Sequence, residues 1–533
     1  MTPAPAEAGR NTRSAVVSEP PVYKIKSIFL SVFSGIVVAL PFCDGRFWIL
    51  AWCGFIPLFF AIEHKAPAQV FFLSYLTGFV FWSITIYWLI HVTFLGQILL
   101  IAYLALYFGL FGLLISAIRY PLSAIRLLCI PSLWVCLEYL RAHLLTGFGW
   151  AFLGYSQYLN LPIIQIADLF GVYGVSFLIM IGNVSIYSLF SEDREKHKKI
   201  SPYFCFLFSV LCFLFSLSYG YYKIYLSAIR SPLSAIRISL IQGNVPQELK
   251  WAYGSQPLIL DSYAQLTKEA ALEKPDIIIW PEASSPGFFG QAEDEWIAQD
   301  ISALAKKIKI PLLIGSVVRE EQMYFNSALF IDENGAIAGR YDKLHLVPFG
   351  EYIPLKHAFR FLESIVPIGD FTPGKEYTLF KLSALRSPLS AQFAVLICFE
   401  DTIPELSRNF VREGADFLVN ITNDAWFKKT SAASEHLAAS VFRAVENRVP
   451  LVRAANTGIS CFIDCCGKIT ARVSEGRGDI FIKGVKTENI FLDKRKSLYP
   501  TIGDVFIAAC LALVVFCGII LKQNGIPHKQ NKV

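Results

Sequence analysis

The chain has 533 residues, of which 54% are hydrophobic and only 17% are charged. This composition is too apolar for a soluble enzyme of the same length, so it indicates a membrane protein. The net charge of +6 does not indicate a nucleic-acid partner, because the lysines and arginines are spread through short loops between apolar runs rather than clustered on one face.

Residues 1–24 are rich in Ala, Pro, Glu, Ser and Arg and predict a disordered cytoplasmic tail. Eight apolar runs near the bilayer-crossing length of about 20 residues are found in the rest of the chain. Seven predict an N-terminal transmembrane domain at 25–223, and the eighth predicts a C-terminal helix at 500–522, followed by a cytoplasmic tail at 523–533. The spans are expected at 28–42, 47–62, 70–90, 95–115, 127–140, 163–190, 203–222 and 502–521.

The positive charges divide the loops between these spans into two sets. One set carries most of the lysines and arginines, whereas the opposite short loops hold only Arg46 and Arg141. Basic loops stay on the cytoplasmic side. An even number of spans then places both termini in the cytoplasm and the polar segment 224–499 outside, which in a bacterial inner membrane is the periplasm.

Two charged residues stand within the fifth apolar run and at its end. Glu138 and Arg141 are three positions apart, so they lie on one helix face and are able to pair. We expect a structural ion pair at the membrane boundary, with contact to a lipid head group as the alternative.

Three segments, at 114–128, 226–237 and 382–391, have related sequences. Each contains Leu-Ser-Ala, which is followed in most copies by Ile-Arg or Leu-Arg. Their irregular spacing excludes a solenoid. Each falls at a connection and contains a proline, so we interpret them as insertions tolerated in loops. A dedicated binding function is the alternative.

The segment 224–499 changes to short apolar runs that alternate with amphipathic stretches. This pattern predicts an α/β domain whose sheet is covered by helices. Strands are expected at 238–242, 277–280, 312–316, 327–331, 395–398, 417–421, 451–454 and 460–464, and helices at 258–273, 295–307, 405–413 and 432–447.

The 12 cysteines show no paired Cys-x-x-Cys or Cys/His spacing, so we predict neither a metal site nor a cofactor. One cysteine has a distinctive position. Cys398 follows the unbroken apolar run 394–397, where a buried strand ends and polar residues begin. A thiol at such a place is a candidate nucleophile, although a single cysteine there is more often a small packing residue.

Two other stretches favour the functional interpretation. Residues 276–282, Asp-Ile-Ile-Ile-Trp-Pro-Glu, form a second apolar run that ends in a carboxylate, Glu282. Residues 340–351, Arg-Tyr-Asp-Lys-Leu-His-Leu-Val-Pro-Phe-Gly-Glu, place Lys343 among apolar neighbours. Alone, Glu282 is equally suited to cap a helix and Lys343 to lie on the surface of a hairpin.

In this order, Trp-Pro-Glu, Tyr-Asp-Lys-Leu-His-Leu-Val-Pro-Phe-Gly-Glu and Ile-Cys-Phe-Glu resemble the Glu-Lys-Cys triad of the nitrilase, or carbon-nitrogen hydrolase, superfamily. With the flanking spans, the chain is similar to a bacterial membrane-bound branch of it. The resemblance implies an eight-helix transmembrane bundle joined to a nitrilase-like α-β-β-α sandwich. It also implies that Glu282 accepts the proton of Cys398 while Lys343 stabilises the oxyanion.

The resemblance assigns supporting roles to four further residues. Glu351 and Glu400 are expected to hold the lysine and the nucleophile loop, and Trp251 matches an aromatic residue of the acyl-binding region. Phe399 is a departure, because the family usually has tyrosine at this position and the phenylalanine lacks its hydroxyl.

The resemblance implies acyl transfer from a phospholipid donor to the N-terminal amine of a diacylglyceryl-modified lipoprotein, in the membrane. Two alternatives come from other classes. A membrane-anchored amide hydrolase shares the triad and releases free acid. A transporter requires charged or broken helices near the bilayer midplane, and the sequence contains few of these.

Overall fold

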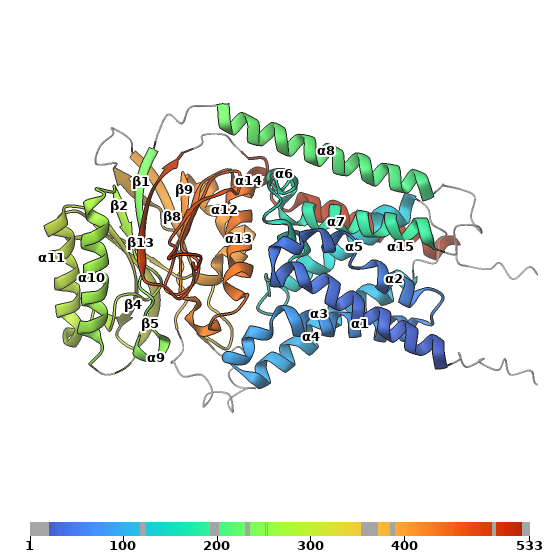
Figure 1. The fold of residues 1–533 in the computed structure, drawn as a ribbon, viewed down its shortest axis with the longest axis horizontal. Coiled ribbons are helices and arrows are strands. Elements are labelled where there is room, and N and C mark those ends of the chain that lie inside the picture. The colour runs from blue at the N-terminus through green and yellow to red at the C-terminus, as the bar shows by residue number, and fades with distance from the viewer. Residues whose placement is uncertain are drawn as a thin grey trace, which may run out of the picture.

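The structure is a computed structural model that describes residues 21–117, 124–191, 202–229, 235–250, 252, 254–352, 371–383, 390–492 and 497–524. It consists of a helical bundle and an α/β domain that lie end to end (Figure 1). Residues 1–20 and 525–533, which include most of the two expected tails, lie outside the described residues.

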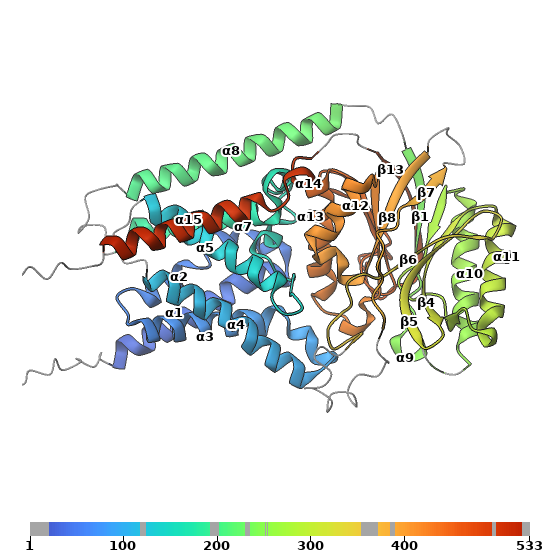
Figure 2. The ribbon, with the colours of Figure 1, turned by 180° about the vertical axis from the view of Figure 1, so that it is seen from behind.

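The bundle combines helices from the first 229 residues with the last helix of the chain. Its main helices are α1 (Pro21–Cys43), α2 (Ile56–Ile62), α3 (Pro67–Thr85), α4 (Phe94–Ala117), α5 (Ala124–His143), α7 (Ala167–Phe190), α8 (Pro202–Ile229) and α15 (Val505–Asn524). Shorter helical segments join them: η1 (Gly45–Trp52), η2 (Tyr87–His91), η3 (Leu153–Gln157), α6 (Leu161–Ile164) and α14 (Tyr499–Ile502). The C-terminal α15 lies beside α5 and α7 in both views (Figures 1 and 2).

Six segments in the described part of the chain are long and apolar enough to cross a membrane. They are Lys24–Cys43, Gly45–Ile62, Pro67–Thr85, Phe94–Ala117, Ala167–Phe190 and Pro202–Ile229. The expected count of eight is therefore not confirmed. The other two expected spans correspond to α5, which carries Glu138 and Arg141, and to α15, whose apolar stretch Val505–Ile520 is shorter.

Helix α8 is the most exposed of the six segments, since only 17% of its most apolar stretch is buried inside the protein. A lipid-facing helix gains little from apolar burial, so close backbone contact and polar links hold it in place. A Cβ at Gly220 would lie only 1.8 Å from the backbone oxygen of Pro162 in α6. Near the end of α8, Lys223 pairs with Asp168 at 2.9 Å and the Tyr219 hydroxyl donates to Asp168 at 2.7 Å.

Two sheets stack face to face in the α/β domain. The first has the order β13-β1-β2-β4-β5-β6, with β3 paired to β4, and the second has the order β12-β11-β10-β9-β8-β7. The first contains β1 (Ala235–Gln242), β2 (Ile277–Ile279), β3 (Phe288–Phe289), β4 (Leu312–Glu320), β5 (Met323–Ile331), β6 (Ile337–Asp342) and β13 (Gly484–Phe491). The second contains β7 (Phe380–Ser383), β8 (Ser390–Ile397), β9 (Phe417–Thr422), β10 (Leu451–Ala455), β11 (Cys461–Ile463) and β12 (Ile469–Arg472).

Helices cover the outer face of each sheet. The first sheet is covered by α10 (Gln256–Leu272) and α11 (Glu295–Ile308), and the second by α12 (Pro404–Glu413) and α13 (Ala432–Asn447) (Figure 1). In α11, Ile297, Ile301 and Leu304 recur at helical spacing and are buried together in the core beneath the first sheet. The layer order confirms the expected α-β-β-α sandwich.

Helix α13 lies between the second sheet and the bundle, and every residue in it except Ser434 is buried. Its far side makes polar contacts with the bundle. Glu446 accepts a hydrogen bond from the backbone N–H of Val172 at 2.8 Å, and Arg448, just after the helix, pairs with Asp168 at 2.9 Å. The α/β domain is thus attached to the bundle by buried polar contacts.

Five strands were not predicted from the sequence: β3, β6, β7, β12 and β13. The longest, β13, contains Lys486, Thr487 and Glu488 in succession and therefore has no apolar run. It lies at the edge of its sheet and pairs antiparallel with β1 from Gly484 to Phe491. Edge strands tolerate such polar sequences because only one side is paired.

The middles of the three repeated segments, at 118–123, 230–234 and 384–389, lie outside the described residues. We had expected these segments to lie in loops, but their described ends belong to helices and strands. Ile229 closes α8 and Ala235 opens β1, while Leu382 and Ala391 pair across β7 and β8.

The close approach of Gly220 to Pro162 predicts a local sensitivity in α8. Replacing Gly220 with alanine should lower the thermal unfolding midpoint of the detergent-solubilised protein, because the new methyl group displaces α8 from α6. Gly518→Ala in α15 is the matched control, since a Cβ there meets no atom within 4 Å. Equal midpoints for the two variants would contradict the packing described here.

Candidate active site

Cys398 lies directly after β8 and opens the short helical turn η7 (Cys398–Thr402), which we call the nucleophile turn. Its backbone has φ +56°, a left-handed conformation that is strained for a residue with a side chain. The carbonyl oxygen of Cys398 accepts hydrogen bonds from Asn420 Nδ2 at 2.9 Å and from His436 Nε2 at 3.2 Å. These contacts hold the strained turn.

Glu282 and Lys343 come from the other sheet. Glu282 follows β2 and is 8% exposed, while Lys343 follows β6 and is 1% exposed. Lys343 Nζ lies 3.7 Å from Glu282 Oε1 and 2.9 Å from Glu351 Oε2. Asn326 Nδ2 in β5 donates to one oxygen of Glu282 and one of Glu351, at 2.8 Å each, and so joins the two carboxylates.

The charges around Cys398 determine its protonation. Burial raises the pKa of the Cys398 thiol, the charge of Glu282 raises it further, and Lys343 lowers it only in part. Burial lowers the pKa of Lys343, but the carboxylates of Glu351 and Glu282 outweigh this effect and leave the pKa above its ordinary value. The site at rest therefore contains a protonated thiol beside a carboxylate and a lysine cation.

Glu400 lies behind this cluster and is fully buried. Its carboxylate accepts hydrogen bonds from the backbone N–H groups of Leu344, His345 and Ile397, at 2.7 to 3.0 Å, and from the Tyr341 hydroxyl at 3.1 Å. Burial raises the pKa of Glu400 to about 7, against the opposing effect of these donors and of the nearby lysine. Glu400 thus connects the segment after Lys343 to the end of β8.

Phe399 contacts the lysine by its ring, whose centroid lies 5.6 Å from Lys343 Nζ. A cation over an aromatic face is attracted to it, and this contact needs no hydroxyl. Trp251 lies outside the described residues.

The structure adds two residues that sequence analysis missed. Asn326 bridges the carboxylates as described above, and Lys250 Nζ donates to the backbone oxygen of Glu282 at 3.2 Å. Burial lowers the pKa of Lys250 to about 8, although Glu282 and Cys398 raise it. Lys250 is the last residue of α9 (Gln247–Lys250). The only sign of its role in the sequence was its position next to Trp251, which matches the family.

A buried charge network supports the nucleophile turn from α13. His436 Nδ1 lies 3.0 Å from Asp424 and Nε2 lies 2.9 Å from Asp401, while Arg453 lies 3.1 Å from both carboxylates. Burial and Arg453 lower the pKa of His436, but the two carboxylates raise it to about 9. His436 is therefore cationic at neutral pH, and it donates to the carbonyl of Cys398.

The described residues contain no group of three or more His, Cys, Asp or Glu side chains suited to a metal ion.

Two family models match the chain. One is described as the apolipoprotein N-acyltransferase N-terminal domain and covers residues 34–185, and the other as carbon-nitrogen hydrolase and covers residues 237–490. The protein is therefore a membrane-helix domain fused to a carbon-nitrogen hydrolase domain.

Curated relatives match over nearly the whole length. The apolipoprotein N-acyltransferase of Geobacter metallireducens is 38% identical over 95% of this chain and 97% of its own. The enzyme of that name from Pasteurella multocida is 31% identical over 95% and 98%. This chain belongs to the apolipoprotein N-acyltransferase family.

Solved structures that resemble the chain cover about half of it. An amidase from Nesterenkonia sp. is 17% identical, with a TM-score of 0.37, and covers 51% of this chain and 95% of its own. A carbon-nitrogen hydrolase from Helicobacter pylori is also 17% identical, with a TM-score of 0.36, and covers 54% and 94%.

The backbone at Glu282 packs closely against a glycine in the neighbouring strand β4. A Cβ at Gly315 would lie 2.4 Å from the oxygen of Pro281 and 2.6 Å from the Cα of Glu282. Gly315→Ala should displace Glu282 and lower steady-state acyltransferase activity on the order of 10- to 100-fold. Gly478→Ala, where the nearest atom is 3.6 Å away, should retain parental activity. Parental activity in both variants would show that the position of Glu282 does not matter.

Proposed function

We propose that the protein transfers an acyl chain from a phospholipid to the N-terminal amine of a diacylglyceryl-cysteine lipoprotein, through a thioester on Cys398. The observation that carries the proposal is the grouping of Cys398, Glu282 and Lys343 next to the membrane domain. A Cβ on Gly149 of the bundle would lie 2.6 Å from the backbone oxygen of Thr402 in the nucleophile turn. The turn that carries Cys398 is therefore in direct contact with the membrane domain.

In the first half-reaction, the Cys398 thiol loses its proton to Glu282 and the sulfur attacks the ester carbonyl of the phospholipid. The raised pKa of the thiol makes this base necessary. The oxyanion forms next to the cation of Lys343, in a site where burial strengthens the attraction. The carbon–oxygen bond then breaks, and the departing lyso-phospholipid oxygen takes the proton from Glu282.

In the second half-reaction, the lipoprotein amine attacks the thioester carbonyl and Glu282 takes the amine proton. Lys343 stabilises the second oxyanion. The carbon–sulfur bond breaks, the amide leaves, and the sulfur recovers its proton from Glu282.

The contacts support the roles proposed for the residues around the triad. Glu351 holds Lys343 by a direct ion pair, and Glu400 orders the two backbone segments that carry Lys343 and Cys398. Phe399 faces the lysine cation with its ring. Trp251 remains assigned to acyl binding by its resemblance to the family.

Transfer is favoured over hydrolysis. The curated relatives are named as acyltransferases, and this supports transfer to an amine over the amide-hydrolase alternative. Burial of Glu282, Lys343 and their surroundings also limits access of water to the thioester.

We further propose that the chain lies in a bacterial inner membrane with eight spans, including α5 and α15, and with the α/β domain in the periplasm. The support is the distribution of basic residues between the two sets of loops and the packing of α15 against α5. The domain limits 25–223, 224–499 and 500–522 belong to the same proposal.

A covalent route predicts a specific kinetic pattern. Initial rates with both substrates varied should give parallel double-reciprocal lines, because the donor product leaves before the acceptor reacts. Labelled phospholipid should label the parent protein in a hydroxylamine-sensitive bond, and Cys398→Ala should take no label. Glu282→Gln and Lys343→Ala should lose acylation and retain membrane insertion. Intersecting lines, or transfer that survives Cys398→Ala, would rule out the thioester.

The topology predicts the location of reporter fusions. A reporter fused after residue 198 should behave as cytoplasmic, with fluorescent-protein signal and no phosphatase activity. A reporter inserted at Ala292, in the segment before α11, should behave as periplasmic, with phosphatase activity and no fluorescence. The measurement is paired alkaline phosphatase and fluorescent-protein activity in cells. Both positions on the same side of the membrane would contradict the eight-span arrangement.

A further inference from the structure

Arg141, near the end of α5, contacts a loop that follows it. We call residues 148–153 the connecting loop. Arg141 is only 4% exposed, and its NH1 group donates to the backbone oxygens of Phe148 at 2.8 Å and Trp150 at 2.7 Å. Its guanidinium carbon also lies 5.0 Å from the ring centroid of Trp82 and 5.1 Å from that of Phe152. Because a buried cation needs polar partners, these charge-assisted hydrogen bonds fix the backbone that supplies the two oxygens.

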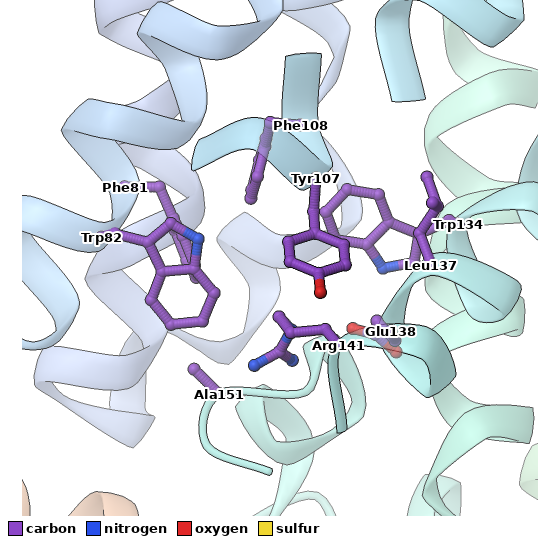
Figure 3. A pocket seen from close by; sticks show the side chains of 9 residues that line it. All are labelled: Phe81, Trp82, Tyr107, Phe108, Trp134, Leu137, Glu138, Arg141 and Ala151. Carbon is purple, nitrogen blue, oxygen red and sulfur yellow. The ribbon is translucent and has the colours of Figure 1, made fainter. Parts of the chain in front are cut away.

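Glu138, one turn earlier, holds the other end of the connecting loop by accepting from the backbone N–H of Leu153 at 2.7 Å. Among the described residues, Glu138 and Arg141 form no salt bridge within 4.0 Å, so the expected direct ion pair is wrong. Each charge instead binds backbone groups of the loop. Both side chains line a cavity together with Tyr107 and Trp82 (Figure 3). The volume of this cavity is about 20 Å³, which is about the size of one water molecule.

The burial of Arg141 also excludes the alternative of a lipid head-group contact. A head group lies at the membrane surface, whereas aromatic rings and the connecting loop enclose this guanidinium (Figure 3).

The connecting loop reaches the nucleophile turn by two contacts. Gly149, between the two carbonyls that Arg141 binds, packs so closely on Thr402 that a Cβ would lie 2.6 Å from the Thr402 oxygen. The ring of Trp150 lies 5.2 Å from the ring of His436, which donates to the carbonyl of Cys398 at 3.2 Å. Both contacts begin within the stretch that Arg141 fixes.

We propose that Arg141 is a positioning residue for the acylation of Cys398, acting from the membrane domain through the connecting loop. The proposal rests on the function proposed above. Arg141 touches neither Cys398 nor any of the carboxylates around it in the described structure. It sets the place of Gly149 and Trp150, and these determine where the strained nucleophile turn lies relative to Glu282 and Lys343.

The test measures the rate at which Cys398 is acylated by labelled phospholipid in a single turnover. Arg141→Met should slow this step on the order of 10- to 100-fold, because a small displacement of the nucleophile has effects of that size. Arg141→Lys should fall between Arg141→Met and the parent, because a lysine keeps the cation and loses the two-carbonyl geometry.

Two controls separate positioning from loss of stability. Leu104→Ala, in the buried core of α4, should lower the unfolding midpoint and leave the acylation rate of the folded protein unchanged. Gly149→Ala perturbs the same link from its other end. The double variant Arg141→Met with Gly149→Ala should be no slower than the slower single variant, because both substitutions break one connection.

An Arg141→Met protein that acylates Cys398 at the parental rate would overturn the proposal. Independent, multiplicative effects of Arg141→Met and Gly149→Ala would overturn it too, since the two residues would then act separately. A parent protein that forms no acyl-enzyme on Cys398 would refute the proposed function and, with it, this inference. Slow acylation in Arg141→Met with normal acylation in Leu104→Ala supports it.

Discussion

The buried cation of Lys343 is the constraint on which the site depends. An ammonium group removed from water is costly unless opposite charges surround it. Glu351 and Glu282 supply that charge, and Asn326 keeps the two carboxylates at fixed positions on either side. Glu282 also raises the pKa of the Cys398 thiol, and Glu351 pairs directly with the lysine. No member of the group can therefore move without changing the charge balance of the others. The proposed chemistry and the local stability therefore depend on the same contacts.

The second constraint is the junction between the two halves of the molecule. Helix α13 packs on the second sheet with one face and on the bundle with the other. His436 from α13 and Arg453 from β10 hold the nucleophile turn within the α/β domain, while the connecting loop reaches it from the bundle. Cys398 is thus positioned by groups from both domains.

The sequence predicted much of this fold and part of the site, for identifiable reasons. The unbroken apolar run before Cys398 predicted a buried strand, and β8 ends at Ile397 as expected. The roles of Glu282 and Lys343 rested on motif resemblance and stay proposals until acylation is measured. Asn326 and Lys250 were missed because their contacts depend on strand register and on the path of α9, which no local pattern encodes. The expected pair of Glu138 and Arg141 failed for a related reason, since helical spacing showed a shared face and gave no sign of the loop that folds back onto it.

The absence of a solvent face on α13 also limits how the protein can be divided. Phe442 packs on Tyr155, Arg443 contacts the hydroxyl of that tyrosine, and Glu446 binds the backbone of Val172. Cutting the chain at the domain limits would expose the Phe442 ring and the Arg443–Glu446 ion pair, which is buried in the intact protein. Such a fragment would self-associate rather than stay in solution. Inhibitor screens and crystallisation efforts for this chain therefore need the intact protein in detergent or lipid.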